Sequence, residues 1–386
     1  MTEPAEPAAS EKTSSQGWST KKWVINIVGG LMVGIGGRLL VAFEDRLPSF
    51  GIVLPIYTLG LLVSTLVHEL GHLVAALLAG FEVVTFAVWP VIIQRAGAKW
   101  KLDIWRPGRF SIGGFVSAFP VGTHALVKRM LWITAGGPVA SWSLAIFAGA
   151  FAIYGTQHSR VWVSTVLTAL VFWSFLMGVA SLRTYTGTQS LSDGSRFRLL
   201  RRGGRPAERF VSIVVLIASS MRGQRPRDWD PDIVHRLACD LDNTPDSMAA
   251  QTLRYNWLHD TWQSEEAETL VEWIAERIQS RKGRQVWQFE LAWFQARHRA
   301  NLEGAHESFD RASGLGKSSA VPLAYFKAKA AIDLAEQRWA DAEVSAHEVL
   351  KETEKLTNAG IAAAIRDEAK EILQELEAAK ARKEAV

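Results

Sequence analysis

Long apolar stretches and long polar stretches occupy different halves of the chain. From Trp23 to about Leu200 the sequence runs through segments with almost no charge, whereas from about Arg201 to Val386 it is rich in Glu, Lys, Arg and Ala. A helix needs roughly 20 apolar residues to cross about 30 Å of hydrocarbon. Four segments meet this requirement, at about residues 23–43, 51–79, 130–154 and 161–182. The pattern predicts a membrane-embedded front half and a water-facing back half.

The segments between and beside these spans have other patterns. Residues 1–20 are polar and aperiodic, which is typical of a disordered leader. Residues 81–123 show β-branched and aromatic alternation, which predicts short strands, part of which dip into the membrane. The apolar run at 210–221 is too short to span comfortably, so we expect an interfacial or buried helix there.

The predicted fold class is mainly α. We expect a polytopic membrane helix bundle with a short β-rich insertion over residues 21–200, and a linker with the interfacial helix over 201–230. Beyond Pro231 apolar residues recur three and four positions apart, which predicts a soluble α-helical, repeat-like domain over 231–386.

Two parts of the helical half resemble each other. In NLEGAHESFDRA and RWADAEVSAHEV, Leu302 aligns with Trp339 and Ala305 with Ala342, and a weaker third copy lies at 264–274. The spacing near 37 is somewhat longer than the 34 residues of tetratricopeptide repeats, which these segments resemble. Such repeated hairpins leave a concave face for a protein or peptide partner. A generic helical bundle is the alternative.

Composition and charge add a location. The 386 residues are 48% hydrophobic and 21% charged with a net charge of +4, and the single cysteine, Cys239, cannot form an internal disulfide. Basic residues lie at segment ends rather than in a stripe with interleaved aromatics, so nucleic-acid binding is not expected. If four helices cross the membrane in alternating directions, most Lys and Arg residues of the connecting segments fall on one side of it. The loops on the other side hold only Arg46 and Arg160. We therefore expect a multi-pass protein of the cell (inner) membrane, with the N-terminus and the C-terminal domain cytoplasmic.

The second apolar segment contains three ionisable residues. In TLVHELGHLVAALLAG, residues 65–80, His68 and His72 are four residues apart and share one helix face, with Glu69 beside them. This H-E-x-x-H arrangement offers two imidazole ligands for zinc and a glutamate placed to take a proton from the attacking water. Because an ionisable residue inside a spanning helix costs at least about 2–3 kcal/mol, three of them need a compensating partner. We predict one Zn2+ per chain, with Glu69 as the catalytic base.

With these residues the chain resembles the site-2 protease family of intramembrane zinc metalloproteases. Members of that family carry the H-E-x-x-H motif on one core helix and an aspartate in an Asp-Gly pair on the last core helix, and here the pair is Asp193-Gly194. The resemblance implies that Asp193 is the third metal ligand beside His68 and His72. It covers roughly residues 50–200.

The same resemblance implies candidates for substrate binding. GGFVSAF, residues 113–119, resembles the family's membrane-associated edge strand, which implies that Gly113, Gly114 and Phe115 contact an extended substrate. A plain hairpin strand is the alternative.

A further stretch resembles the Gly-Pro segment of the family's middle core helix. It is TAGGPVAS, residues 134–141, and a role in helix packing explains it equally well. Ser141 and Ser181 stand near positions where the family often carries asparagine. A serine side chain lacks the amide N–H donors and carbonyl acceptor of asparagine. Ser141 and Ser181 are therefore weaker candidates for substrate binding.

The resemblance implies an intramembrane endopeptidase that cleaves a peptide bond in or near a transmembrane helix of a membrane-protein substrate. The helical domain would then recruit or gate substrates. The alternative is a catalytically inactive relative that acts as a membrane-anchored interaction scaffold. Glu69 distinguishes the two, because a structural zinc site needs ligands but no proton acceptor, and its presence favours the enzyme.

Overall fold

The computed structural model describes residues 50–96, 99–105, 113–155, 161–183, 192–237 and 245–384. The predicted leader and the first predicted span, residues 23–43, lie outside the described residues. The described part is mainly helical, with thirteen α-helices and four strands. It divides into two compact units, the described residues within 50–61 and 144–173, and those within 62–143 and 174–384.

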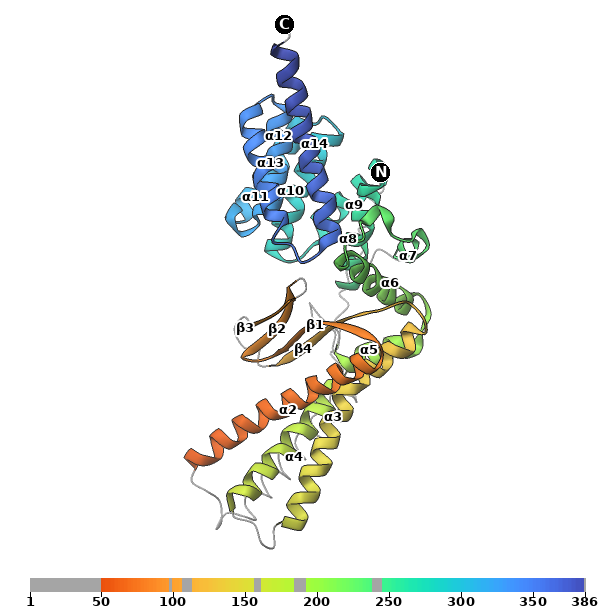
Figure 1. Ribbon diagram of the computed structural model, residues 1–386, viewed down its shortest axis with the longest axis vertical. Helices are drawn as coiled ribbons and strands as arrows, with labels where there is room; N and C mark the ends of the chain where they lie inside the picture. Colours follow the sequence, from red (N-terminus) through yellow and green to blue (C-terminus); the bar gives the residue numbers. More distant parts are fainter. Residues whose placement is uncertain are drawn as a thin grey trace, which may run out of the picture. The chain divides into compact units, whose positions relative to one another are not determined.

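Three helices are long and apolar enough to cross a membrane. They are α2 (Phe50–Leu78), α3 (Leu126–Gly155) and α4 (Val161–Leu182) (Figure 1). The predictions at 51–79, 130–154 and 161–182 are therefore confirmed as helices of spanning length. α3 begins before the predicted apolar segment because Lys128 and Arg129 continue the helix ahead of it.

In the larger unit, small residues bring α2 and α3 into close contact. A Cβ added to Gly71 would lie 2.3 Å from the carbonyl oxygen of Gly136, and one added to Gly136 would lie 2.4 Å from that of Gly71. Only glycine fits at this crossing, which is how small residues pack helices in a membrane. The hydroxyls of Ser64 and Ser174, 2.9 Å apart, join α2 to α4.

The smaller unit contains the remaining parts of the same three helices. Here Gly60 of α2 packs against α4, since an added Cβ would lie 3.1 Å from the Cβ of Ala169. The rings of Tyr57 and Phe172 also meet, with centroids 6.2 Å apart.

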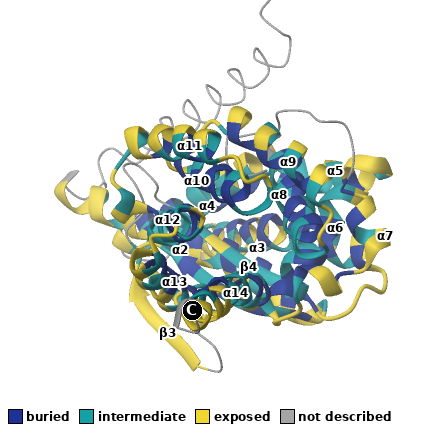
Figure 2. Cartoon of the chain, turned by 90° about the horizontal axis from the view of Figure 1, so that it is seen from above, coloured by how far each residue is buried: buried dark blue, intermediate teal, exposed yellow. Residues whose placement is uncertain are grey.

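The strands between α2 and α3 form one antiparallel sheet in the order β3-β2-β1-β4. Buried and half-buried positions alternate along β1, as expected for a strand with one face on a core. β3 is exposed along its length (Figure 2), and β4 is the opposite edge. The strands predicted within 81–123 are confirmed. They are β1 (Phe81–Val88), β2 (Val91–Ala96), β3 (Lys99–Ile104) and β4 (Gly114–Pro120).

The back half is helical, as predicted, and successive helices from α8 onward pack against one another. The segments with similar sequence form α11 and α13, where Ala305 and Ala342 are both fully buried. The assignment to tetratricopeptide repeats stays a prediction. The elements are α5 (Asp193–Arg202), α6 (Gly204–Met221), η2 (Pro226–Asp228), α7 (Pro231–His235), α8 (Pro245–Asp260), α9 (Ser264–Arg277), α10 (Arg281–His298), α11 (Leu302–Leu315), η3 (Ser318–Ala320), α12 (Pro322–Ala335), α13 (Trp339–Thr353) and α14 (Ala359–Glu384).

Helix α6 contributes to two hydrophobic cores. Val215 packs in the core that holds Phe81 of β1, whereas Ile213 and Leu216 pack in the core that holds Leu258 of α8. The run predicted as an interfacial or buried helix at 210–221 is helical, and one side of it packs in these cores; its position relative to a membrane stays a prediction.

Arg129 joins the end of α2 to the loop that follows β4. Its guanidinium donates to the carbonyl oxygens of Ala79 at 2.6 Å, Gly80 at 2.7 Å and Gly122 at 3.2 Å. It also lies over the ring of Phe81, 4.9 Å from the centroid. One charged side chain therefore fixes β1 and β4 against the end of the membrane helix.

We expect the substitution Arg129→Gln to lower the free energy of unfolding by about 1–3 kcal/mol, because charged hydrogen bonds to backbone carbonyls are lost. The check is the thermal unfolding midpoint of the detergent-purified protein. Lys128→Gln is the matched control, since Lys128 directly precedes Arg129 in the same helix and is exposed. Equal unfolding midpoints for the two variants would show that Arg129 does not hold the sheet against α2.

Candidate functional site

His68 and His72 lie on one face of α2. The helix continues without a break through both residues, and their rings are nearly perpendicular with centroids 4.9 Å apart. Both side chains are buried, and so is Glu69. The four-residue spacing therefore has the consequence that the sequence predicts, because one turn of helix brings the two imidazoles next to each other on one face.

Asp193 is the first residue of α5. Ser192 caps this helix, since its hydroxyl accepts a hydrogen bond from the Ser195 N–H at 3.2 Å and donates to the Arg183 carbonyl at 2.6 Å. Gly194 lies against the end of α4, where an added Cβ would be 2.0 Å from the Leu182 carbonyl oxygen. The glycine of the Asp-Gly pair is therefore required by the close approach of α5 to α4.

The structure brings His68, His72 and Asp193 together. Asp193 Oδ2 lies 3.3 Å from His68 Nε2 and 3.2 Å from His72 Nε2, and one ligand atom of each residue lies within 4.8 Å of the others. Zinc bonds of about 2.0–2.1 Å at tetrahedral angles would put two ligand atoms about 3.3 Å apart. Both distances from Asp193 to the imidazoles therefore match the spacing of two zinc ligands.

The orientation of the His72 ring points to a cation between these groups. Its Nδ1 lies 2.7 Å from the Ile133 carbonyl oxygen, which can only accept, so Nδ1 carries the proton. In the neutral imidazole the Nε2 lone pair then faces Asp193 Oδ2. Two acceptors at this distance repel unless a proton or a metal ion lies between them. His68 has a similar partner, because its Nδ1 lies 2.9 Å from Ser141 Oγ.

Asp193 is held in its ionised form. Burial raises the pKa of its carboxyl. When protons rather than a metal ion lie between it and the imidazoles, the hydrogen bonds and positive charge of protonated His68 and His72 lower that pKa more, so that it lies well below its usual range. A carboxylate that stays charged at neutral pH is the form that binds a divalent cation.

Glu69 lies beside the strand β4. A Cβ added to Gly114 would be 2.4 Å from Glu69 Cγ, so only glycine leaves room for the glutamate. In the described part of the chain, no side chain makes a hydrogen bond or an ion pair with the Glu69 carboxylate. Glu69 is therefore placed between the histidines and the first residue of the edge strand.

A second glycine shapes the site from α3. A Cβ added to Gly137 would lie 2.3 Å from His72 Nε2 and 2.7 Å from His68 Nε2. The backbone of α3 therefore forms one wall of the space in front of both ring nitrogens. Sequence reasoning did not assign this role, or that of the Ile133 carbonyl, although the Gly-Gly-Pro of TAGGPVAS was a signal that something approaches the helix here.

The remaining sequence-predicted residues are not gathered at one point. Phe115 of β4 is 40% exposed and contacts Trp105, and Gly113 precedes the strand with open space where a side chain would lie. Ser141 contacts His68, whereas the Ser181 hydroxyl donates to the Gly178 carbonyl one turn back in its own helix, at 3.1 Å.

Comparison with protein families gives one match. The model of peptidase family M50 matches residues 56–354, a range that includes both the H-E-x-x-H motif and Asp193. No curated protein and no solved structure matches the chain. Since the match covers more than half of the chain, this protein belongs to peptidase family M50, the site-2 protease family.

Proposed function

We propose that this chain is an intramembrane zinc metalloendopeptidase, which hydrolyses a peptide bond in or near a transmembrane helix of a membrane-protein substrate. Membership of the family supports a membrane peptidase. The single observation that carries the zinc assignment is the His72 ring, whose Nε2 lone pair faces the Asp193 carboxylate. Zn2+ bound by His68, His72 and Asp193 would act as a Lewis acid toward water and the scissile carbonyl.

Glu69 is the proposed general base. It lies one residue from His68 on a helix that holds it rigidly, and its carboxylate has no partner in the described part of the chain. A base in this position takes the proton from the attacking water and passes it to the leaving amine. A purely structural metal site would have no use for a buried, unpaired glutamate.

The edge strand β4 is the proposed substrate-binding element. Its other side pairs with β1, and its free edge offers backbone N–H and C=O groups to an extended peptide. Gly114, at the start of the strand, is packed on Glu69, so a peptide paired there would run past the base. Gly113 and Phe115 flank this point. A substrate helix must unwind to pair in this way.

The location of the two halves remains part of the proposal. The three apolar helices and the family support a multi-pass membrane protein. The excess of basic residues in the loops on one side of the membrane supports a cytoplasmic N-terminus and a cytoplasmic helical domain over 231–386. The helical domain would recruit or gate substrates.

We expect Glu69→Gln to reduce peptide release from membranes by about 10²–10⁴-fold, because it removes the proton acceptor but no metal ligand. Mass spectrometry of fragments released by cells with the wild-type protein or with the variant measures this. Zinc content by elemental analysis should stay at about one ion per chain. Glu208→Gln is the control, since Glu208 is exposed on α6. Unchanged release by Glu69→Gln would leave only the scaffold alternative.

We expect Asp193→Ala to lose bound zinc, because two imidazoles alone hold the ion weakly. The metal content of the purified variant, set against the wild type, gives the answer. Full zinc occupancy in Asp193→Ala, with an unchanged unfolding midpoint, would show that the third ligand is another residue.

Ser141 should affect metal affinity through His68. Because its hydroxyl contacts His68 Nδ1, we expect Ser141→Ala to weaken zinc binding by about 10–100-fold. Competition with a chelator measures the affinity, and Ser143→Ala on the same helix is the matched control. If Ser141→Ala lowers cleavage while zinc affinity stays the same, the residue contacts substrate instead.

A further inference from the structure

Three arginines of α5 lie on one side of that helix. Arg198, Arg201 and Arg202 are three and four residues apart, so their side chains are neighbours on the helix surface, and all three are exposed. Leu200 lies on the opposite side and is 2% exposed, which fixes the direction in which the helix faces. We call the three exposed arginines the arginine face.

The arginine face has no acidic partner within the chain. None of its three side chains makes a hydrogen bond or an ion pair in the described part of the protein. Asp193 is the one acidic residue of α5, and its carboxylate faces His68 and His72 instead. Like charges at this spacing destabilise a helix. The helix dipole favours Arg201 and Arg202, but it is equivalent to only about half a charge. Most of this positive charge is therefore available to an anion from outside the chain.

Helix α5 lies where the apolar helices end. Gly194, at its start, packs against the carbonyl oxygen of Leu182, the last residue of α4. Leu200, near its end, is buried in the core that also holds Ala76, close to the end of α2, and Leu126, the first residue of α3. The ten residues of α5 are about 15 Å long. The headgroup region is about 5–8 Å deep on each side of a bilayer, and arginine side chains reach toward it.

We propose that the arginine face binds the negatively charged headgroups of anionic phospholipids. A lipid is favoured over a soluble anion or an acidic protein because α5 packs at the ends of all three apolar helices. Basic residues that cluster directly beside a membrane helix attract anionic lipids in this way. The contact needs neither zinc nor catalysis, so it can be tested independently of the proposed function.

Native mass spectrometry of the full-length protein, released from nonionic detergent, measures this binding. The probes are phosphatidylglycerol and phosphatidylcholine with identical acyl chains, added in increasing amounts. We expect phosphatidylglycerol to bind at least about tenfold more tightly, because the headgroup of phosphatidylcholine has no net charge. Equal retention of the two lipids would show that the proposal is wrong.

Variants of the arginine face locate the lipid. The triple variant Arg198→Gln, Arg201→Gln and Arg202→Gln should bind phosphatidylglycerol no better than phosphatidylcholine. Arg201→Gln alone should weaken phosphatidylglycerol about fivefold, which is the effect of one basic residue near an anionic surface. A triple variant that keeps the preference of the wild type would place the lipid elsewhere and overturn the assignment.

A second triple variant controls for net charge. Lys282→Gln, Arg284→Gln and Lys317→Gln remove the same charge from exposed positions of the helical half and should leave the lipid preference unchanged. Equal losses in the two triple variants would show an effect of total charge and contradict the proposal. Glutamine has a helix propensity close to that of arginine, and the arginine face has no ion pair to lose. The unfolding midpoints should therefore stay the same, and if the triple variant of α5 does not fold, the single variant decides.

Soluble competitors distinguish a lipid from other anions. Glycerol 3-phosphate has a charged phosphate but no acyl chains, and hexaglutamate is an acidic peptide. Neither should displace phosphatidylglycerol at about 1 mM, because neither gains from apolar contact beside the helices. Displacement by glycerol 3-phosphate would show a site for soluble anions, and displacement by hexaglutamate would show a surface for acidic proteins. Either result would overturn the assignment to a lipid.

Discussion

The contact between His72 and Asp193 constrains how α2, α3 and α5 pack around the candidate site. The Ile133 carbonyl fixes the proton of His72 on Nδ1, so that the other ring nitrogen turns a lone pair toward a carboxylate. Among apolar helices, water is scarce and an uncompensated polar contact costs several kcal/mol. A cation bound at this point would convert that cost into a bond between α2 and α5, which are more than a hundred residues apart in the chain. Metal binding would therefore also hold these two helices together.

Glycines make that contact accessible. Gly71 and Gly136 let the backbones of α2 and α3 touch, which moves Ile133 and Ser141 within reach of the two imidazoles. Gly137 then leaves space in front of the ring nitrogens, where a side chain would fill the position proposed for the metal. Each glycine has a separate steric reason, yet all three serve the same end: a polar site between helices whose surfaces are otherwise apolar.

The local part of the site could be predicted from the sequence. His68, Glu69 and His72 lie within one turn, so helix periodicity alone fixes their relation. Asp193 could be predicted as the third ligand only from the family resemblance. The spacing of residues does not say which distant carboxylate lies close to His68 and His72 in the fold. The hydrogen-bond partners of the imidazoles could not be predicted, since the crossing of α2 and α3 determines them. Of the fold, helices and strands followed from periodicity, whereas the order of the sheet did not.

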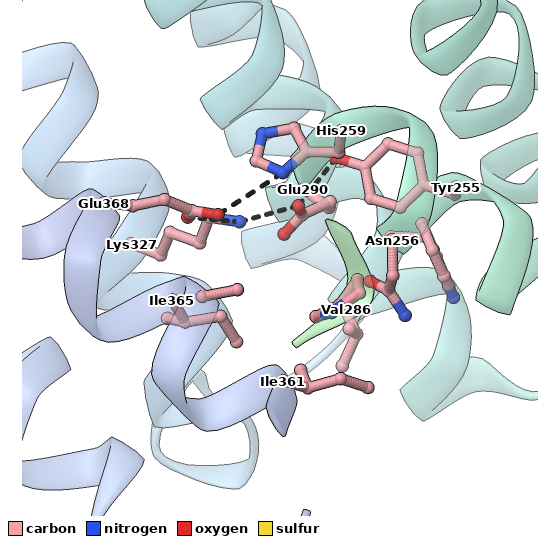
Figure 3. Close-up of a pocket in the computed structure, with 12 residues that line it drawn as sticks. Tyr255, Asn256, His259, Val286, Glu290, Lys327, Ile361, Ile365 and Glu368 are labelled. Carbon is pink, nitrogen blue, oxygen red and sulfur yellow. Dashed lines mark hydrogen bonds and ion pairs between the residues drawn. The ribbon is translucent and has the colours of Figure 1, made fainter. Parts of the chain in front are cut away.

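The buried charges of the helical half were missed for a different reason. In an Ala-, Glu- and Lys-rich sequence, a residue such as Lys327 is expected on a solvated surface, but it is buried and paired with Glu290 and Glu368 (Figure 3). A signal was present nonetheless. Tyr255, Glu290, Lys327 and Glu368 recur at 35 to 41 positions, close to the repeat spacing, and each lies on an alternate helix. Equivalent positions of stacked hairpins face a common interior, so charges at that period should have suggested a shared polar core.

The segment that follows α6 contacts both the sheet and the helical half of the chain. Arg222 donates to the carbonyl oxygen of Pro120, the last residue of β4, and its guanidinium lies 3.8 Å from Glu82 of β1. Three residues later, Arg225 pairs with Asp260 of α8 and Asp367 of α14. The edge strand and these two helices are thus joined by four consecutive residues that are held at both ends. A coupling free energy of about 1–3 kcal/mol is enough for one site to affect another severalfold. Because residues 222–225 contact the proposed substrate-binding strand at one end and helices α8 and α14 at the other, a rearrangement of the helical half would reach that strand through this segment.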